Sequence, residues 1–347
     1  MSASTAARSL AARAFRSREA VLFGVLAVLF VVMSARVEGF FDAFNLLERT
    51  RYWVAVGLIA VPMTFIIATG GIDLSVASML ALCGIVAGLL HRDAHWPMAA
   101  ASLGALAVGL GAGAANGWVI SVIRVPPLVV TLATMALYRG VAMGLSQARA
   151  ISDFPAGFLW LGQGSLFRIP FLPGDAAYLP APLVLLLLAY LAGWALLRRS
   201  WVGRFTELIG ENETAARFAA IDVPRMKFGL YAAAGLVCGL AALVHTAIYA
   251  TAKADTATGA ELEAIACVVI GGTRISGGHA SIVGTLLGLC IFGLLRFGLE
   301  MAGVGAQNIM ILVGIVLVAT AIVNEWLSRP AGRRAAGREA SAKGAQG

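Results

Sequence analysis

Long apolar runs, separated by short polar turns, make up most of this chain. They lie at residues 21–35, 52–69, 76–90, 96–123, 128–144, 181–197, 228–250, 264–270, 281–302 and 308–326. A helix that crosses the hydrocarbon core of a bilayer needs about 20 predominantly apolar residues, and most of these runs approach or reach that length. The pattern therefore predicts an all-α fold: a polytopic transmembrane helical bundle of about ten spans.

Two double glycines interrupt the apolar pattern. Gly70-Gly71 ends the second run, and Gly271-Gly272 ends the eighth run, which is unusually short. Because so short a run cannot cross a bilayer, it either extends back through residues 256–263 or forms a broken helix buried in protein. The sequences around the two glycine pairs are weakly alike, as in transporters built from internal repeats, although glycine- and leucine-rich segments also resemble one another by chance. We predict broken helices at both places.

One long polar stretch, residues 198–227, stands apart from the apolar runs. It contains ENETAARFAAID, in which Asn212 is the predicted N-cap of a short helix. The small face of this helix is formed by Ala215, Phe218 and Ala219, at the i, i+3, i+4 spacing. A helix of two or three turns is marginally stable alone in water, so we expect a groove on a partner protein to receive it.

The basic residues orient the chain. Most of the lysines and arginines lie near the two ends and in the even-numbered loops. Since cytoplasmic segments carry an excess of Lys and Arg, we expect both termini and residues 198–227 to be cytoplasmic. The predicted organisation is a basic cytoplasmic tail at 1–18, a single transmembrane domain at 19–328, and a second basic cytoplasmic tail at 329–347. The first apolar run resembles a signal peptide, but the many later spans favour an uncleaved helix.

The composition agrees with a membrane protein. Of the 347 residues, 60% are hydrophobic and 13% are charged, whereas soluble domains carry about 25% charged residues. The formal charge of +8 comes from the ends and the basic loops rather than from one patch. We therefore predict no nucleic-acid partner.

No catalytic or metal-binding pattern is present in the sequence. The four cysteines lie singly in apolar runs, and the four histidines show no H-E-x-x-H spacing. The phosphate-binding pattern G-x-x-x-x-G-K-[ST] is also missing from the sequence. We therefore expect a protein that is not an enzyme and needs no metal or cofactor. If ATP drives transport, another chain binds it.

Glycines recur one helical turn apart in two of the runs. Gly109, Gly113 and Gly117 lie in one run, and Gly235 and Gly239 lie in another. Small residues at this spacing let two helices approach backbone to backbone in lipid, so we expect close packing there. A dinucleotide-binding interpretation fails because no strand precedes the first set.

Six polar or charged residues within or beside the apolar runs are candidates for a translocation path: Asp73, Asn116, Arg139, Glu261, Glu263 and Arg296. An arginine at the bilayer centre costs about 2.5–3.5 kcal/mol. The two arginines should therefore face the bundle interior or extend toward the interface.

Four of these residues also have an alternative role. Asp73 either lines the path or caps the following helix. Arg296 has Glu300 at i+4, so a local ion pair is the alternative there. Glu261 and Glu263 either form a rim that faces the solute or are solvated loop carboxylates.

Four stretches carry a resemblance to a known family. They are residues 70–76 (GGIDLSV), 125–140 (VPPLVVTLATMALYRG), 209–227 (IGENETAARFAAIDVPRMK) and 261–304 (ELEAIACVVIGGTRISGGHASIVGTLLGLCIFGLLRFGLEMAGV). The chain resembles the permease subunits of bacterial ABC importers for monosaccharides, which include the ribose, xylose, rhamnose and autoinducer-2 permeases. The similarity runs from about residue 45 to 325, and residues 45–76 look most like the rhamnose and autoinducer-2 branch.

The resemblance implies a function and a set of partners. The chain would translocate a monosaccharide across the bacterial inner membrane, surrounded by membrane lipid, with a cytoplasmic ABC ATPase, a periplasmic sugar-binding protein and a second permease chain, identical or homologous. The residues that the resemblance assigns to ATPase coupling are Gly210, Glu211, Asn212, Ala215, Ala216, Arg217 and Phe218. A neutral polyol also suits a chain with few charges inside its spans, because conduction requires weak, transient binding.

The chain departs from the family pattern at four positions. Glu211, Ala220 and Ala77 stand where glycine is common, and Arg274 stands where a small residue is usual. The first two departures bear on how the short cytoplasmic helix pivots.

The alternative function is an ion-coupled secondary transporter of a small polar solute. Such a transporter needs an acidic residue in the membrane as an ion relay, and Asp73, Glu261, Glu263 and Glu300 are the acidic residues near spans that suit this role.

Overall fold

The computed structural model describes residues 18–169 and 178–305, together with 307–309, 311, 312, 314, 315 and 318. The predicted tail at 329–347, nearly all of the tail at 1–18 and most of the apolar run at 308–326 lie outside these residues. Within the described part the chain is almost entirely helical. The one sheet found there is an antiparallel pair, β1 (Ser165–Arg168) and β2 (Tyr178–Pro180).

Most of the helices follow the predicted apolar runs. The helices are α2 (Arg18–Arg36), α3 (Ala43–Ala68), α4 (Val76–Arg92), α5 (Met98–Trp118) with the π-helical turn η1 (Val119–Ile123), α6 (Pro127–Ser146), α7 (Ala156–Gln163), α8 (Ala181–Arg199), α9 (Trp201–Glu211), α10 (Glu213–Phe218), α11 (Val223–Tyr249), α12 (Ala260–Ile270) and α13 (Ile282–Met301). Helices α7, α9 and α10 lie between the predicted runs. Among the described residues, seven helices are long and apolar enough to cross a membrane: α2, α3, α5 with η1, α6, α8, α11 and α13. The all-α, polytopic prediction is confirmed, whereas the count of about ten spans stays a prediction.

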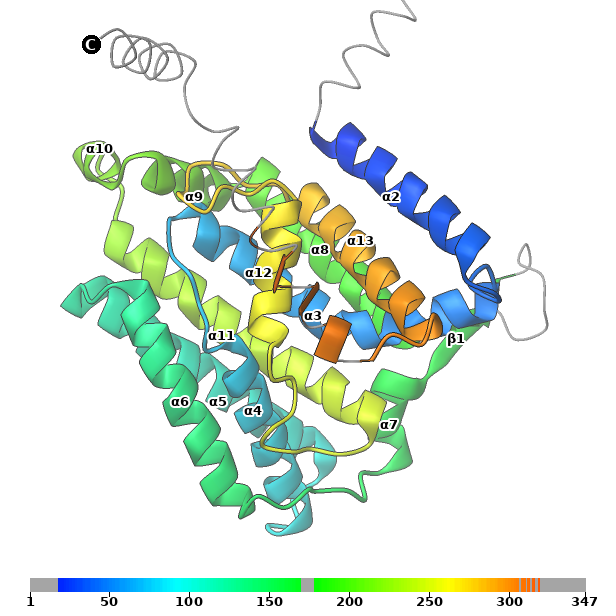
Figure 1. Ribbon diagram of the computed structural model, residues 1–347. Helices are drawn as coiled ribbons and strands as arrows, with labels where there is room; N and C mark the ends of the chain where they lie inside the picture. The colour runs from blue at the N-terminus through cyan, green and yellow to red at the C-terminus, as the bar shows by residue number, and fades with distance from the viewer. Residues whose placement is uncertain are drawn as a thin grey trace, which may run out of the picture.

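Helix α3 lies at the centre of the bundle. It contacts α8, α11, α12 and α13, and its residues from Val54 to Ala68 are nearly all buried. Helix α2 lies on the outside along α13 (Figure 1). An apolar helix that buries so little of its surface in protein fits a lipid-facing position.

Helices α5 and α11 pack backbone to backbone at the predicted glycines. A methyl group at Gly235 would collide with the carbonyl oxygen of Gly109, and one at Gly113 would collide with the carbonyl oxygen of Tyr231. The colliding atoms are backbone atoms of the facing helix, which cannot move aside on their own. The two helices would therefore have to separate to remove the collision. The close packing inferred from the glycine spacing is confirmed.

We predict that Gly235→Ala destabilises the protein by about 1–3 kcal/mol, the usual cost of overpacking a well-packed interface. The measurement is the thermal unfolding midpoint of the purified chain in detergent. Gly111→Ala is the matched control, because a methyl group there meets nothing within 4 Å. Equal midpoints for the two variants would contradict the prediction.

Both predicted helix breaks are present. After α3, Gly70 adopts a φ of +78°, and an extended segment leads to α4. After α12, Gly272 adopts a φ of +89°. Helix α12 begins at Ala260, so the short run extends back only slightly, and its 11 residues cover about 16 Å. Since that is about half of a hydrocarbon core, the broken-helix alternative holds, and residues 264–269 of this helix are all buried.

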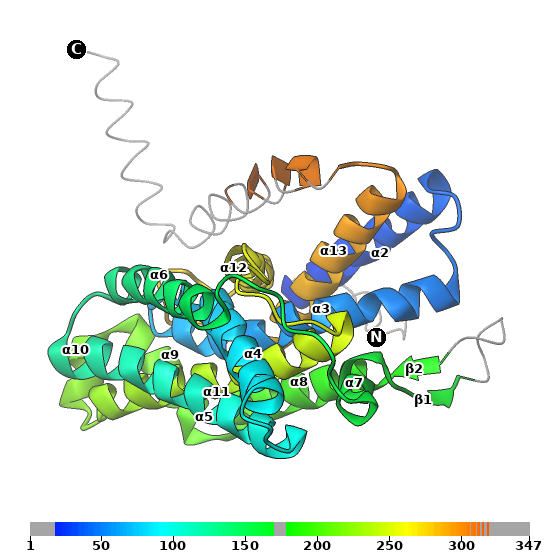
Figure 2. The ribbon, with the colours of Figure 1, turned by 90° about the horizontal axis from the view of Figure 1, so that it is seen from below.

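The bundle has two distinct ends. At one end lie α10, the C-terminal end of α3 and the start of α13, where the backbone N–H of Gly278 donates to the carbonyl of Ala68 at 3.0 Å. The N-terminal end of α2 is there too, because the Ser281 hydroxyl donates to Glu19 at 3.1 Å. At the opposite end lie α7 and the β1–β2 hairpin, far from α10 (Figure 2). We call these the α10 end and the hairpin end.

Candidate functional site

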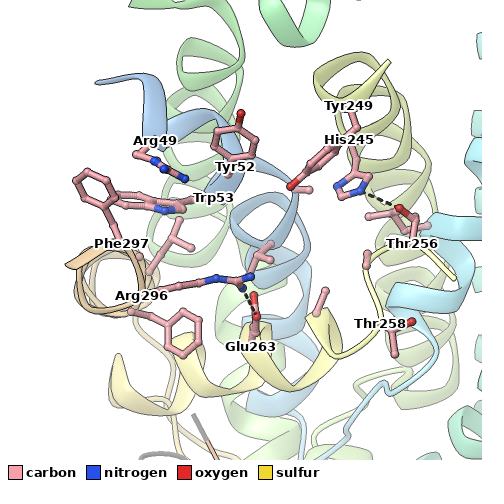
Figure 3. Close-up of a pocket in the computed structure, with 18 of the residues that line it drawn as sticks. Arg49, Tyr52, Trp53, His245, Tyr249, Thr256, Thr258, Glu263, Arg296 and Phe297 are labelled. Carbon is pink, nitrogen blue, oxygen red and sulfur yellow. Dashed lines mark hydrogen bonds and ion pairs between the residues drawn. The ribbon is translucent and has the colours of Figure 1, made fainter. Parts of the chain in front are cut away.

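A cavity of about 620 Å³ lies near the hairpin end, because Tyr52 in its wall directly follows Arg51, which bonds Gly164 and Ser165 beside and within β1. Its wall is formed by the N-terminal half of α3, the C-terminal end of α11, residues 251–258, the start of α12 and the C-terminal half of α13. Side chains from these elements converge on one space (Figure 3). Concave sites of this size that mix apolar and polar groups are the usual binding sites for small molecules.

A chain of ion pairs crosses one wall of the cavity. Arg296 on α13 binds Glu263 on α12 through Nη1 at 2.6 Å and Glu300 through Nε at 3.0 Å. Arg49 on α3 reaches Glu300 at 3.4 Å. Arg296 therefore both makes the local i+4 pair and faces the cavity. The two carboxylates are balanced by the two guanidinium groups, so this wall offers hydrogen bonds without a net charge.

Aromatic rings form the other distinctive part of the wall. Tyr52 on α3 and Tyr249 on α11 lie with ring centroids 5.7 Å apart, and His245 lies against Tyr249 at 4.6 Å. Trp53 and Phe297 also line the cavity (Figure 3). Aromatic side chains present a flat apolar face together with polar edges. Such a wall is suited to a ring that has apolar C–H faces and hydroxyl groups at its rim.

The loop between α11 and α12 folds back into the bundle, and Arg139 holds it there. Arg139 on α6 donates from Nη1 to the carbonyls of Ala254 at 2.6 Å and Thr256 at 2.8 Å. His245 bonds the Thr256 hydroxyl at 3.0 Å, and Ala252 pairs with Ile151 as an isolated bridge. Non-helical backbone at membrane depth is tolerated only where its polar groups are satisfied. Arg139 thus supports the cavity wall from behind.

We predict that Arg139→Met lowers the stability of the protein by about 1–3 kcal/mol, because two loop carbonyls lose a charged donor. Arg139→Lys should retain part of this stability, since an ammonium group can still donate to one carbonyl. The check is the unfolding midpoint of the three purified proteins. If Arg139→Met and Arg139→Lys unfold at the wild-type midpoint, the loop does not depend on this guanidinium group.

Asp73 and Asn116 belong to a separate buried network. Asp73 Oδ1 accepts from the backbone N–H of Ser75 at 2.9 Å and from its hydroxyl at 2.6 Å. Asn116 on α5 donates to the Ser75 hydroxyl at 2.8 Å and accepts from the Tyr138 hydroxyl at 3.0 Å. Ser75 occupies the N-cap position of α4, and that helix has no side-chain cap hydrogen bond. Asp73 therefore bonds the residue before the helix rather than the N–H groups of its first turn, and it does not line the cavity.

The six predicted path residues therefore fall into different places. Glu263 and Arg296 line the cavity. Asp73 and Asn116 lie in the buried network, Arg139 lies behind the wall, and Glu261 has a buried oxygen without a hydrogen-bond partner in the described part of the chain. Their assignment to a translocation path stays a prediction.

Several cavity residues were not anticipated from the sequence. They are Arg49, Tyr52, Trp53, His245, Tyr249, Lys253, Asp255 and Phe297. In the sequence, the signal for these cavity residues was a concentration of aromatic and charged residues at helix ends. The topology brings those helix ends to the same side of the bundle. Individually, all of these residues except Asp255 resemble interfacial aromatic or basic residues.

The predicted short helix is α10, at the opposite end of the bundle. Asn212 is its N-cap, and its Oδ1 accepts from the N–H of Ala215 at 2.9 Å. Ala216 is buried against Ile209 and Val223, whereas the small face with Ala215 is exposed. Phe218 on that face is 89% exposed. The outward face of α10 thus presents an unpaired aromatic ring.

An ion pair between Glu213 and Lys227 joins α10 to the start of α11. Glu213 binds Arg217 and Lys227, both at 2.6 Å. Partial burial alone would raise the pKa of Glu213, but the hydrogen bonds and charges of Lys227 and Arg217 outweigh it, so its pKa lies below the usual value. Glu213 stays ionised in the folded protein at neutral pH.

The end of α9 packs tightly against both helix breaks. A methyl group at Gly210 would collide with the Ala68 carbonyl and the Gly278 nitrogen. One at Gly277 would lie 2.9 Å from the Gly210 Cα and 3.0 Å from the Gly70 nitrogen. Displacement of α9 and α10 must therefore move the ends of α3 and of the α12–α13 loop, because no space separates them.

One departure from the family pattern has a structural consequence. Ala220, which follows α10, adopts a φ of +60°. Left-handed backbone costs an L-residue about 1–2 kcal/mol, whereas glycine adopts it freely. Because Ala220 is not a glycine, the backbone of the turn directly after α10 is strained.

The chain is similar to known permease proteins over most of its length. Residues 45–321 match the family described as branched-chain amino acid transport system / permease component. The ribose import permease protein RbsC of Bacillus subtilis is 36% identical over 302 residues, which cover 86% of this chain and 90% of the relative. The autoinducer 2 import system permease protein LsrD of Escherichia coli K12 is 33% identical over 323 residues, which cover 90% of this chain and 96% of the relative. No solved structure matches the chain.

Proposed function

Because this chain belongs to the family described as branched-chain amino acid transport system / permease component, we propose that it is the transmembrane permease subunit of a bacterial ABC importer for a monosaccharide. It is a multi-pass protein of the inner membrane and is a transport component rather than an enzyme. The observation that carries the proposal is the cavity of about 620 Å³ with aromatic rings and balanced ion pairs in its wall.

The ion-pair wall of the cavity and the names of the two relatives support a sugar. Arg296 already binds both Glu263 and Glu300, so this wall offers paired groups that can hydrogen-bond hydroxyls. Lys253 and Asp255 also line the cavity, so the sugar assignment rests on the ion-pair wall and on the relatives rather than on a lack of charged groups. The two relatives described above are named for ribose and autoinducer 2, and both names favour a sugar-like solute. Within that class we propose rhamnose or an autoinducer-2-like sugar, from the similarity of residues 45–76 to that branch.

A cytoplasmic ATPase is the proposed source of energy. The exposed Phe218 on a capped, outward-facing α10 supports a docking site for it, and the sequence contains no phosphate-binding loop of its own. We propose further that a periplasmic binding protein delivers the sugar at the hairpin end. A second permease chain, identical or homologous, completes the pore.

The packing supports a mechanical route between the two ends. ATPase closure would push α10 and α9, and Gly210 would pass that displacement to the glycine breaks after α3 and α12. The other ends of α3 and α12 carry cavity residues, including Tyr52 and Glu263. A shift of these elements would open the cavity toward the cytoplasm while closing it toward the periplasm.

The test is uptake into proteoliposomes that contain the permease, the ATPase and the binding protein encoded with it. We expect ATP-dependent uptake of one labelled monosaccharide, competed by related sugars and not by leucine or valine. Uptake competed only by branched-chain amino acids would contradict the sugar assignment.

An ion-coupled transporter remains the second candidate because of one observation. Asp73 is fully buried, and its Oδ2 has no hydrogen-bond partner among the described residues. Ionisable residues buried in membrane proteins commonly serve ion pathways. Uptake by the purified chain on a proton or sodium gradient, with no ATPase present, would favour this candidate.

A further inference from the structure

A second, smaller cavity of about 190 Å³ lies at the α10 end. It is formed between the corner that joins η1 to α6 and the corner that joins α10 to α11. Its wall shares no residue with the large cavity at the hairpin end. Nothing in the proposed transport cycle uses it.

The wall of the small cavity is positively charged. Arg124, Arg217 and Lys227 line it together with a single carboxylate, that of Glu213. Arg217 and Lys227 share this carboxylate. The backbone N–H of Arg124 donates to the Val119 carbonyl, but the Arg124 guanidinium group makes no hydrogen bond or ion pair with the residues that the structure describes. A formal excess of two positive charges therefore faces one small space.

A buried hydroxyl adds an unused hydrogen-bonding group. Ser121, on η1, is 5% exposed and lines the cavity, and its Oγ has no partner within the described residues. Buried polar atoms without partners are uncommon in native proteins and call for an explanation. The start of α6 also borders the cavity without a side-chain cap, and a helix N-terminus favours negative charge. These features together suit an anionic group with several oxygens.

The surroundings identify the kind of molecule. Four exposed apolar residues flank the cavity on η1 and α6: Val122, Ile123, Leu128 and Val129. They belong to helices that are long and apolar enough to span the membrane, so they are positioned to meet acyl chains. Basic pockets between membrane helices bind lipid headgroups. A free phosphate would gain nothing from this apolar border.

We propose that the small cavity binds the phosphate of an anionic phospholipid. The phosphate contacts Arg124, Lys227 and the Ser121 hydroxyl, and the acyl chains lie along Val122 and Leu128. Because Glu213 and Arg217 belong to α10, the bound lipid steadies the helix that we propose as the ATPase docking site. The site itself does not depend on that proposed function.

The test is native mass spectrometry of the purified full-length chain titrated with phosphatidylglycerol, with phosphatidylcholine as the zwitterionic comparison. Arg124→Gln is expected to weaken phosphatidylglycerol binding about fivefold, which corresponds to about 1 kcal/mol per basic residue. Ser121→Ala should weaken it as well. Arg225→Gln is the matched control, because Arg225 is at the same end, is 89% exposed and does not line the cavity.

Three results would overturn the proposal. Equal losses of phosphatidylglycerol affinity for Arg124→Gln and Arg225→Gln would mean that binding depends only on the overall charge of the protein. Equal binding of phosphatidylcholine by the wild-type chain would remove the anionic requirement. Displacement of phosphatidylglycerol by inorganic phosphate would identify a free phosphate as the ligand and exclude the lipid. Since binding is read without transport, these outcomes are independent of whether the chain imports a sugar.

Discussion

Phe218→Ala is expected to weaken the affinity of the ATPase for this permease about 10- to 100-fold. The ring is 89% exposed in the isolated chain, and docking would bury it. Burying a phenylalanine side chain contributes about 1.5–3 kcal/mol, which converts to that range of affinity. Aromatic residues at the centre of an interface commonly dominate its binding energy. The measurement is the dissociation constant between the purified ATPase and the permease in lipid nanodiscs.

Two further variants separate docking from general damage. Phe218→Trp should retain most of the affinity, because a larger ring can fill the same groove. Phe167→Ala removes another exposed ring, which is 60% exposed on β1 at the hairpin end, and it should leave the affinity for the ATPase unchanged. If Phe218→Ala binds the ATPase as tightly as Phe167→Ala does, α10 is not the docking site.

Arg296→Met is expected to lower the efficiency of sugar uptake about tenfold. The change leaves Glu263 and Glu300 facing the cavity without their shared guanidinium group. Loss of a charged hydrogen-bond partner costs about 1.5–3 kcal/mol, and solvent screening in this partly open cavity reduces that figure. The measurement is the initial rate of ATP-dependent uptake as a function of sugar concentration.

The ion-pair geometry orders the effects of neighbouring variants. Glu263→Gln should have a smaller effect than Arg296→Met, because Arg296 keeps its pair with Glu300. Arg92→Met is the matched control, since Arg92 forms an exposed pair with Asp93 and does not line the cavity. A rate for Arg296→Met equal to that for Arg92→Met would show that the solute does not pass this wall.

The features that the sequence predicted well are those with local causes. The Asn212 cap of α10 depends on a side chain and a backbone N–H three residues apart. A few consecutive residues are therefore enough to predict it. The breaks after α3 and α12 likewise follow from glycines at positive φ. The packing of α5 on α11 was predictable because small residues repeat at the helical period.

The cavity was not predictable in the same way. Tyr52, Tyr249 and Phe297 come from three helices that are distant in the sequence, and their convergence depends on how these helices cross. Arg139 was predicted to line the translocation path because placing an arginine within a membrane span costs free energy. Its partners are backbone carbonyls 115 and 117 residues away. Every residue has such a carbonyl, so the residue types in a sequence do not reveal this contact. A single sequence thus predicted the elements, and tertiary contacts decided the roles of their polar residues.

The central claim is that a separate ATPase drives this bundle through α10. Its most direct test is ATP-dependent sugar uptake into vesicles that carry the complete transporter with residues 212–218 replaced by a glycine-serine linker of equal length. The unfolding midpoint of the isolated permease serves as a check that the bundle remains folded. We predict a folded permease whose ATP-dependent uptake is abolished. Uptake at the wild-type rate would contradict the claim.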